Sequence, residues 1–171
     1  MKKAATSLLF FFFFYLAVPG QSNDDKLVKL SKVFQDEISR EMSGWSCRSL
    51  EPSKGVIIQY WSSGQIGVKI SVVEYASIAK AAEGFQEFKT HLKIEEEATS
   101  RHRGQEIHLI KEESLNLGDE GFVWDIRGSD AVVFRKGEMI INFSVFSPPT
   151  AKDVYFSRKF AGLVAAALKS P

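Results

Sequence analysis

Cysteine is almost absent from this chain, because Cys47 is the only one among 171 residues. A chain with a single thiol cannot form an internal disulfide, so the fold must be held by an apolar core. We expect Cys47 to act as a small buried hydrophobe. Pairing with a second molecule and chemical reactivity are the alternatives, but the Trp45-Ser46-Cys47-Arg48 context lacks the surroundings of a papain-type nucleophile.

An excess of charge of one sign is also missing. The chain has 22 lysines and arginines against 21 aspartates and glutamates, a formal net charge of +1. Nucleic acids and anionic membranes favour proteins with a clustered basic excess. The composition therefore predicts that nucleic acid is not a partner.

Recognisable catalytic motifs are lacking as well. There is no Gly-x-Ser-x-Gly elbow and no His-Glu-x-x-His pair. The segment Ser77-Ile78-Ala79-Lys80 has Ser-x-x-Lys spacing but fits the capped start of a helix better. We therefore assign no catalytic residue and no cofactor.

What the chain does have is an apolar leader. Lys2 and Lys3 precede an apolar run over residues 4–18, and small residues lie three and one positions before Gln21. This pattern is typical of a secretory signal peptide over 1–20, and an uncleaved membrane anchor is the alternative. We expect residues 21–171 to form a single globular domain that is secreted or periplasmic, with no stable membrane insertion after cleavage.

The first half of that domain predicts a helix, a hairpin and a second helix. Apolar residues recur at helical spacing from Leu27 to Met42, and Gly44 can end that helix. Residues 56–61 and 66–73 read as strands around a Ser63-Gly64 turn. A helix follows from Ser77, and residues 107–110 indicate a short strand.

The second half predicts a three-stranded meander over 122–127, 131–134 and 139–145, followed by a helix over about 151–168. The expected fold class is therefore α+β, with an antiparallel sheet of five or six strands and an N-terminal, a middle and a C-terminal helix. Strands followed by a helix occur twice, which suggests an internal repeat of topology.

A family resemblance lies in the last third, in the segments Leu117-Gly118-Asp119-Glu120-Gly121, Val132-Val133-Phe134-Arg135-Lys136-Gly137 and Ile140-Ile141-Asn142-Phe143-Ser144-Val145. These segments resemble exported bacterial α+β domains, such as mycobacterial sensor-kinase ectodomains, small envelope lipoproteins and PsbP-like folds. The chain lacks the paired cysteines of the sensor domains. The resemblance implies an extracytoplasmic binding, sensing or accessory module.

Two sets of side chains are candidates for a site. Trp61, Trp124 and Arg135 could hold an anionic or aromatic ligand, although Arg135 could instead pair with Asp125 or another acid across the strands. His91, His102 and His108 share a glutamate-rich stretch and could hold a metal ion.

Three functions follow from these observations. We expect a non-enzymatic binding, sensing or accessory domain whose partner is an unknown small molecule or an envelope protein. One alternative is a metal-dependent hydrolase that uses the segment 91–113. The other is a structural or assembly protein of the cell envelope.

Overall fold

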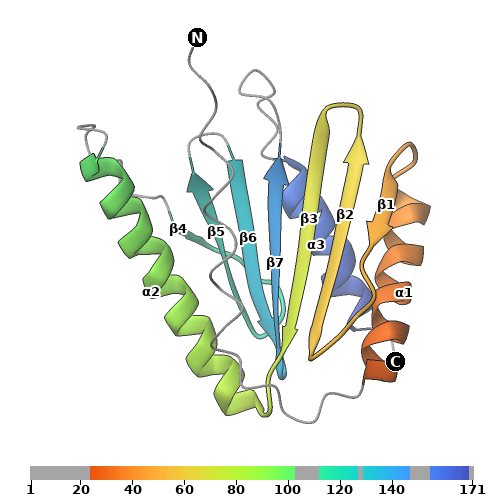
Figure 1. Ribbon diagram of the computed structural model, residues 1–171, viewed down its shortest axis with the longest axis horizontal. Coiled ribbons are helices and arrows are strands. Elements are labelled where there is room, and N and C mark those ends of the chain that lie inside the picture. The colour runs from red at the N-terminus through yellow and green to blue at the C-terminus, as the bar shows by residue number, and fades with distance from the viewer. Residues whose placement is uncertain (1–23, 103–111, 127–128, 147–154, 170–171) are drawn as a thin grey trace.

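A computed structural model describes residues 24–102, 112–126, 129–146 and 155–169 (Figure 1). The elements in chain order are α1 (Asp24–Glu41), β1 (Ser46–Ser49), β2 (Val56–Ser63), β3 (Ile66–Glu74), α2 (Ile78–His102), β4 (Glu112–Ser114), β5 (Glu120–Ile126), β6 (Ser129–Lys136), β7 (Met139–Phe146) and α3 (Tyr155–Ala167). The α+β fold with an antiparallel sheet and three helices is confirmed. None of the described helices has the length and apolar character needed to span a bilayer.

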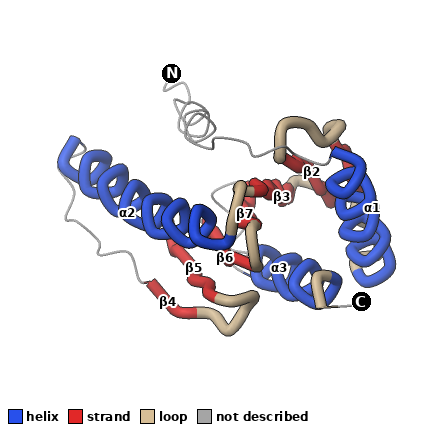
Figure 2. The backbone as a smooth tube through the Cα atoms, turned by 90° about the horizontal axis from the view of Figure 1, so that it is seen from below, coloured by secondary structure: helices blue, strands red, loops and turns tan. Residues whose placement is uncertain are grey.

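The sheet has seven strands in the order β1-β2-β3-β7-β6-β5-β4. The pairing of β3 with β7 joins the first half of the chain to the second. An internal repeat would need such a pairing to combine its two halves in one sheet. The helices break the repeat, because α2 lies on one face of the sheet while α1 and α3 lie on the other (Figure 2). If the two halves were related by a twofold axis perpendicular to the sheet, α2 and α3 would lie on the same face.

The predicted helix signals are confirmed where the chain is described. The α1 helix buries Leu27, Phe34 and Ile38, and Gly44 follows it with φ of 82°. Glycine suits this left-handed conformation because it has no Cβ. At the start of α2, the hydroxyl of Ser77 accepts a hydrogen bond from the Lys80 amide at 3.2 Å.

Other boundaries differ from the prediction. The strand β1 was not predicted, and β4 begins at Glu112, whereas residues 107–110 lie outside the described part. The α2 helix extends to His102, ten residues past the end of its apolar stripe at Leu92. The C-terminal helix is described from Tyr155, because residues 147–154 are also outside the described part.

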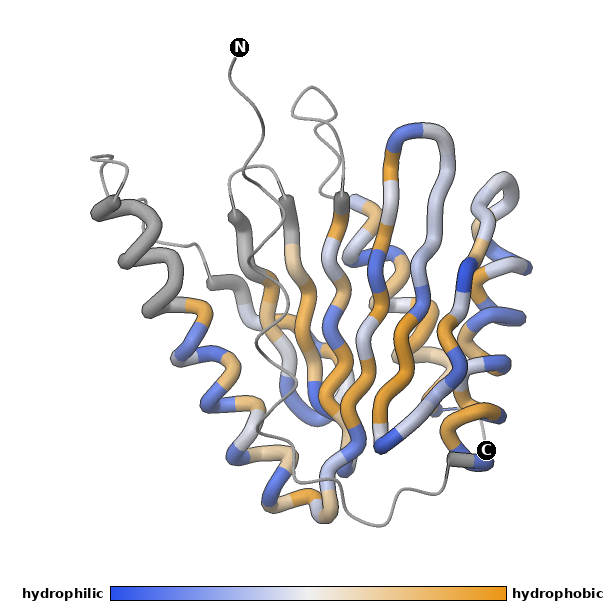
Figure 3. Tube along the Cα trace, viewed as in Figure 1, coloured by the Kyte–Doolittle hydropathy of each residue, from blue (hydrophilic) through white to orange (hydrophobic). Residues whose placement is uncertain are grey.

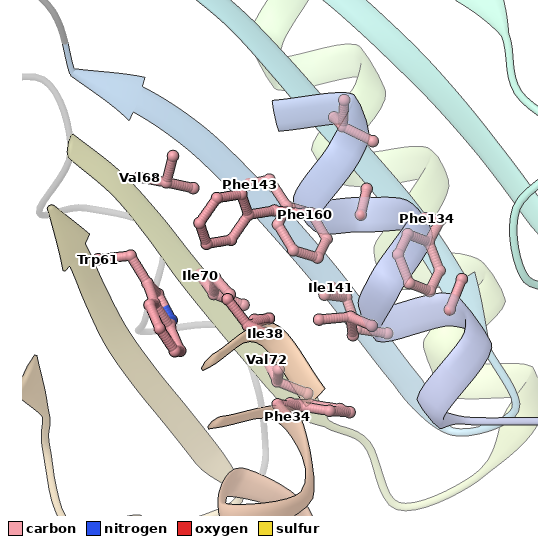
Figure 4. Close-up of a cluster of buried hydrophobic side chains, with 14 of the residues drawn as sticks. Phe34, Ile38, Trp61, Val68, Ile70, Val72, Phe134, Ile141, Phe143 and Phe160 are labelled. Carbon is pink, nitrogen blue, oxygen red and sulfur yellow. The ribbon is translucent and has the colours of Figure 1, made fainter. Parts of the chain in front are cut away.

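The larger hydrophobic cluster fills the space between the sheet and the α1 and α3 helices (Figure 4). Phe134 and Phe143 stack with ring centroids 5.9 Å apart, and Phe160 of α3 meets Trp61 edge-on at 5.8 Å. Aromatic pairs at these separations add to the stability that burial of their area provides. This cluster takes side chains from both halves of the chain.

The opposite face of the sheet is divided into an apolar and a polar part. Under α2, the side chains of Phe122, Ala131, Val133 and Ile140 pack with Phe85 in a smaller cluster. Among the described elements, no helix covers the same face over β2 and β3 (Figures 1 and 2). Along β2, β3 and β7, polar residues interrupt the hydrophobic ones (Figure 3).

Candidate ligand-binding surface

Trp61 belongs to the core of the protein. Only 1% of its surface is exposed, and its indole Nε1 donates a hydrogen bond to Gln59 Oε1 at 3.1 Å. It points toward α3 in the larger cluster (Figure 4). Trp61 follows Tyr60 in β2, so strand alternation puts the two side chains on opposite faces of the sheet. The indole therefore lies on the face that is covered by helices, away from the exposed ring of Tyr60.

Gln59 is a buried polar residue that the sequence analysis missed. Its Nε2 donates to the carbonyl oxygen of Ser31 at 2.7 Å and to the Ser31 hydroxyl at 3.0 Å. Together with the bond from Trp61, these contacts use the carboxamide as both donor and acceptor, as a buried amide requires. A glutamine in the apolar run Val56-Ile57-Ile58-Gln59 was the available signal. This network fixes α1 against β2.

Arg135 forms ion pairs with Asp119 and Glu120 rather than with Asp125. Its Nε donates to Glu120 Oε1 at 2.6 Å, and its Nη1 donates to Asp119 Oδ2 and to the Gly137 carbonyl, both at 3.1 Å. Asp125 instead lies opposite Asp130 in the β5–β6 register. The guanidinium thus ties the start of β5 to the turn between β6 and β7.

Asp119 holds the same turn through backbone and side-chain contacts. Its Oδ2 accepts the Gly137 amide hydrogen at 2.7 Å, and its Oδ1 accepts from Lys136 Nζ at 3.0 Å. These two interactions, led by the backbone bond, lower the pKa of Asp119 below its usual 3.8. Gly118 has φ of 64°, and a Cβ there would collide with the Arg135 carbonyl. The Gly-Asp motif is therefore explained by turn geometry.

The three predicted ligand-binding residues do not form one surface in the described part of the chain. Trp61 faces α1 and α3, whereas Arg135 lies opposite Ile140 on the face toward α2. The strands β2 and β6 are also separated by β3 and β7. The backbone of Trp124 pairs with that of Ala131, and its side chain is outside the described atoms.

The histidine prediction rests largely on undescribed residues. His91 is exposed on α2, His102 ends that helix with only its backbone described, and His108 lies outside the described residues. Among the side chains that the structure does place, no three histidine, cysteine, aspartate or glutamate residues come together as a metal-binding group. The metal site stays a prediction.

A different set of polar side chains is brought together by the pairing of the central strands. We call this set the polar strip: Tyr60, Lys69, Ser71, Asn142 and Ser144. Tyr60 is opposite Lys69, Lys69 is opposite Ser144, and Ser71 is opposite Asn142. All five alternate onto the face toward α2, next to the apolar cluster beneath that helix.

The polar strip combines partly desolvated groups with an exposed ring. Tyr60 is 41% exposed, whereas Ser71 and Ser144 are only 9% and 6% exposed. Lys69 Nζ lies 6.0 Å from the centre of the Tyr60 ring, and burial lowers the pKa of Lys69. The strip therefore brings a lysine, hydroxyl groups and an aromatic ring together on neighbouring strands.

Asn142 is the most unusual member of the polar strip. Its Oδ1 is removed from water and has no hydrogen-bond partner among the described groups. Leaving a buried polar atom unpaired costs about 1–3 kcal/mol, and most such atoms in native proteins have a partner. An asparagine retained in the centre of a sheet at this cost is a candidate for contact with a ligand.

The sequence signals for the polar strip were present but incomplete. Lys69 and Ser71 alternate with apolar residues in one predicted strand, and Asn142 and Ser144 do so in another. Nothing in the sequence indicated that these two strands are neighbours. Their pairing across 71 positions of sequence, from Ser71 to Asn142, is what assembles the surface.

No family model, curated protein or solved structure was found to match the chain.

Proposed function

We propose that this protein is an exported, non-enzymatic binding module that holds a small molecule on the polar strip. The observation that carries the proposal is the buried and unpaired Oδ1 of Asn142. The atom is closed to solvent, so a ligand's hydrogen-bond donor reaches it only when the groups that cover it move; the bond then removes the cost of leaving it unpaired.

Two further observations support binding at this place. Four of its five residues lie on β3 and β7, which are paired strands inside the sheet, and this gives the strip a rigid base. Its hydroxyl and amide side chains are suited to hold a ligand by hydrogen bonds, with the exposed ring of Tyr60 available for stacking.

Export is supported by the leader over residues 1–20, which has the basic start and apolar centre of a signal peptide. We expect the full chain, expressed in a bacterium with a periplasm, to be recovered from the periplasmic fraction with Gln21 as its first residue. Intact-mass measurement tests this. A chain that keeps Met1, or that stays in the cytosol, would contradict export.

Binding can be tested by NMR titration of the exported chain with a library of small polar compounds. We expect at least one compound to shift the amide resonances of β3 and β7 around Ser71 and Asn142. The Asn142→Leu variant should lose that response, whereas Asn116→Leu, at an exposed asparagine, should keep it. Shifts confined to other elements would contradict the proposed surface.

A further inference from the structure

The α2 helix covers the part of the sheet that borders the polar strip. Strand pairing places Phe122 of β5, Val133 of β6 and Asn142 of β7 in one row, all on the face toward α2. Phe122 and Val133 pack with Phe85 of α2 in the smaller cluster. Side chains directly opposite in an antiparallel pair have Cβ atoms about 4.5–5.5 Å apart. Asn142 is therefore the immediate neighbour of a side chain that α2 covers.

A second neighbour of Asn142 lies under the same helix. Ile140 is two positions away on β7, so it points to the same face, and it also belongs to the smaller cluster. The Oδ1 atom of Asn142 is closed to solvent. Because α2 packs on two of the side chains that adjoin Asn142, it is the described element whose displacement most directly opens a path to that atom.

The packing of α2 is much smaller than that of the helices on the opposite face. Among the described side chains of α2, residues 78–92, those that are buried belong to Ala81 and Phe85. In the described part of the chain, the smaller cluster has five buried residues, whereas the larger cluster under α1 and α3 has nineteen. Burial of apolar area is the main source of stability, so α2 can leave the sheet at a lower free energy than the larger cluster can open.

Two further contacts between α2 and β5 are polar and lie near the surface. Gln86 Nε2 donates a hydrogen bond to Glu120 Oε2 at 3.3 Å, and Lys89 Nζ lies 5.5 Å from the centre of the Phe122 ring. Contacts of these kinds at partly exposed positions contribute little compared with buried apolar area, because water replaces them when they break. They guide the helix to its closed position without preventing it from opening.

The joint between β3 and α2 is fixed to the sheet. The Tyr75 amide donates to the Glu138 carbonyl oxygen at 2.8 Å, and the Ser77 hydroxyl caps the first turn of α2. The Tyr75 ring also packs closely against Gly84. These contacts hold the base of the helix, so residues 75–77 are the natural hinge for a motion of α2 relative to the sheet.

We infer that α2 is a lid on the proposed binding surface, which swings away from β5, β6 and β7 about residues 75–77 and so gives a ligand access to Asn142 Oδ1. This inference rests on the proposed binding function and names the conformational change that binding requires. Opening also uncovers the apolar side chains of Val133 and Ile140 beside the polar strip. A ligand that binds only the open state shifts the population toward that state.

Thiol labelling measures the opening, with Cys47→Ala as the background so that each variant has one cysteine. Iodoacetamide should modify Ile140→Cys and Asn142→Cys at similar rates, because one motion exposes both positions. Both should react at least about tenfold faster than Ile141→Cys, which is adjacent in sequence but lies in the larger cluster. Both should also react at least about tenfold more slowly than Ser62→Cys, at an exposed position of β2.

Two controls separate opening of α2 from unfolding of the whole chain. Urea denaturation of each variant gives its global stability, so labelling that is faster than global unfolding allows reports a local opening. Hydrogen exchange on the unsubstituted chain needs no folded variant. Its α2 amides over residues 81–92 should share one opening free energy and exchange at least about tenfold faster than those of β7.

A cross-link then tests whether the lid controls binding. Gln86→Cys and Glu120→Cys, joined by a short bismaleimide in the Cys47→Ala background, hold α2 on β5. A compound that perturbs β3 and β7 in the library titration should bind the linked chain at least about tenfold more slowly than the unlinked one. The same linker between Ser46→Cys and Ser62→Cys, opposite each other on β1 and β2, should have no effect.

The outcomes distinguish the lid from the binding function. Labelling of Asn142→Cys as slow as Ile141→Cys, or as fast as Ser62→Cys, would overturn the lid, and so would unchanged binding to the chain linked through α2. In each case a library compound that perturbs the strip would leave the binding function standing. If labelling shows the opening but no compound perturbs β3 and β7, the proposed function fails and α2 has no binding to control.

Discussion

At the scale of single residues, a substitution of Asn142 is expected to change stability and ligand binding in opposite directions. Leucine has the same branching of heavy atoms as asparagine but no polar atoms, so Asn142→Leu removes the unpaired acceptor at the cost of a somewhat larger side chain. We expect the free energy of unfolding to rise by about 1 kcal/mol, because the buried Oδ1 that lacks a partner is removed. Urea denaturation tests this, with exposed Asn116→Leu as the control. A large loss of stability would mean that the carboxamide already has a partner inside the protein.

Cys47 lies half-buried at the edge of the core, and desolvation raises the pKa of its thiol from 9.0 to about 11. Only the thiolate reacts with alkylating agents. A difference of two pKa units lowers the thiolate fraction at mildly alkaline pH by about a hundredfold. We therefore expect iodoacetamide to modify the folded chain about a hundred times more slowly than the urea-unfolded chain. Equal rates in the two states would show that the thiol is exposed and unperturbed.

Asp119 should make stability depend on pH. The pKa of its carboxyl is lowered in the folded state, so its contribution is present above the unfolded value of 3.8 and is lost as pH falls through the lower folded value. Asp119→Asn should reduce the free energy of unfolding by up to about 1 kcal/mol at neutral pH. The difference from wild type should shrink toward zero in strong acid. Urea denaturation of wild type and variant, at neutral pH and in strong acid, measures this difference. The Asp36→Asn variant, at an exposed aspartate, should show no comparable change.

At the scale of elements, Gly84 shows how a tertiary contact can override helix propensity. A Cβ at Gly84 would lie 2.6–2.7 Å from the phenol of Tyr75, so the ring would have to move. Propensity alone predicts a gain of about 1 kcal/mol for Gly84→Ala. We expect a loss of about 1–3 kcal/mol instead, because α2 or Tyr75 must shift within the smaller cluster.

Gly162 in α3 is the matched control for Gly84, because a Cβ there would meet nothing within 4 Å. Gly162→Ala should therefore raise the free energy of unfolding by about 0.5–1 kcal/mol. Thermal and urea denaturation of both variants give the comparison. Stabilisation by both substitutions would show that Tyr75 does not pack against α2 as described.

Local patterns in the sequence predicted most elements but not how they meet. Residue spacing was sufficient for α1, the hairpin and the meander, because amphipathic periods and turn residues are local signals. It missed β1, whose Ser-Cys-Arg-Ser sequence has no apolar alternation and becomes a strand by pairing with β2. At position 84 the group that excludes a Cβ is the side chain of Tyr75, a tertiary contact that leaves no local pattern.

The candidate site was harder to predict for the same reason. Tryptophan and arginine were chosen for their chemistry, but Trp61 completes the core and Arg135 secures a turn. The strip depends on the register between β3 and β7, which are far apart in sequence. Such a juxtaposition is set by tertiary packing and leaves no local pattern.

At the scale of the whole molecule, the pairing of β3 with β7 makes the folding of each half of the chain depend on the other. The larger cluster contains Ile70 and Val72 from the first half, Ile141 and Phe143 from the second, and residues of both α1 and α3. Neither half can bury its apolar face alone, so we expect one cooperative unfolding transition. Native-state hydrogen exchange should give the amides of β3 and β7 the same opening free energy. Reductant should leave that value unchanged, because a single cysteine provides no internal cross-link. Faster exchange throughout one half would mean that the pairing of β3 with β7 does not couple the unfolding of the two halves. The polar strip would then lack the fixed register on which its proposed binding depends.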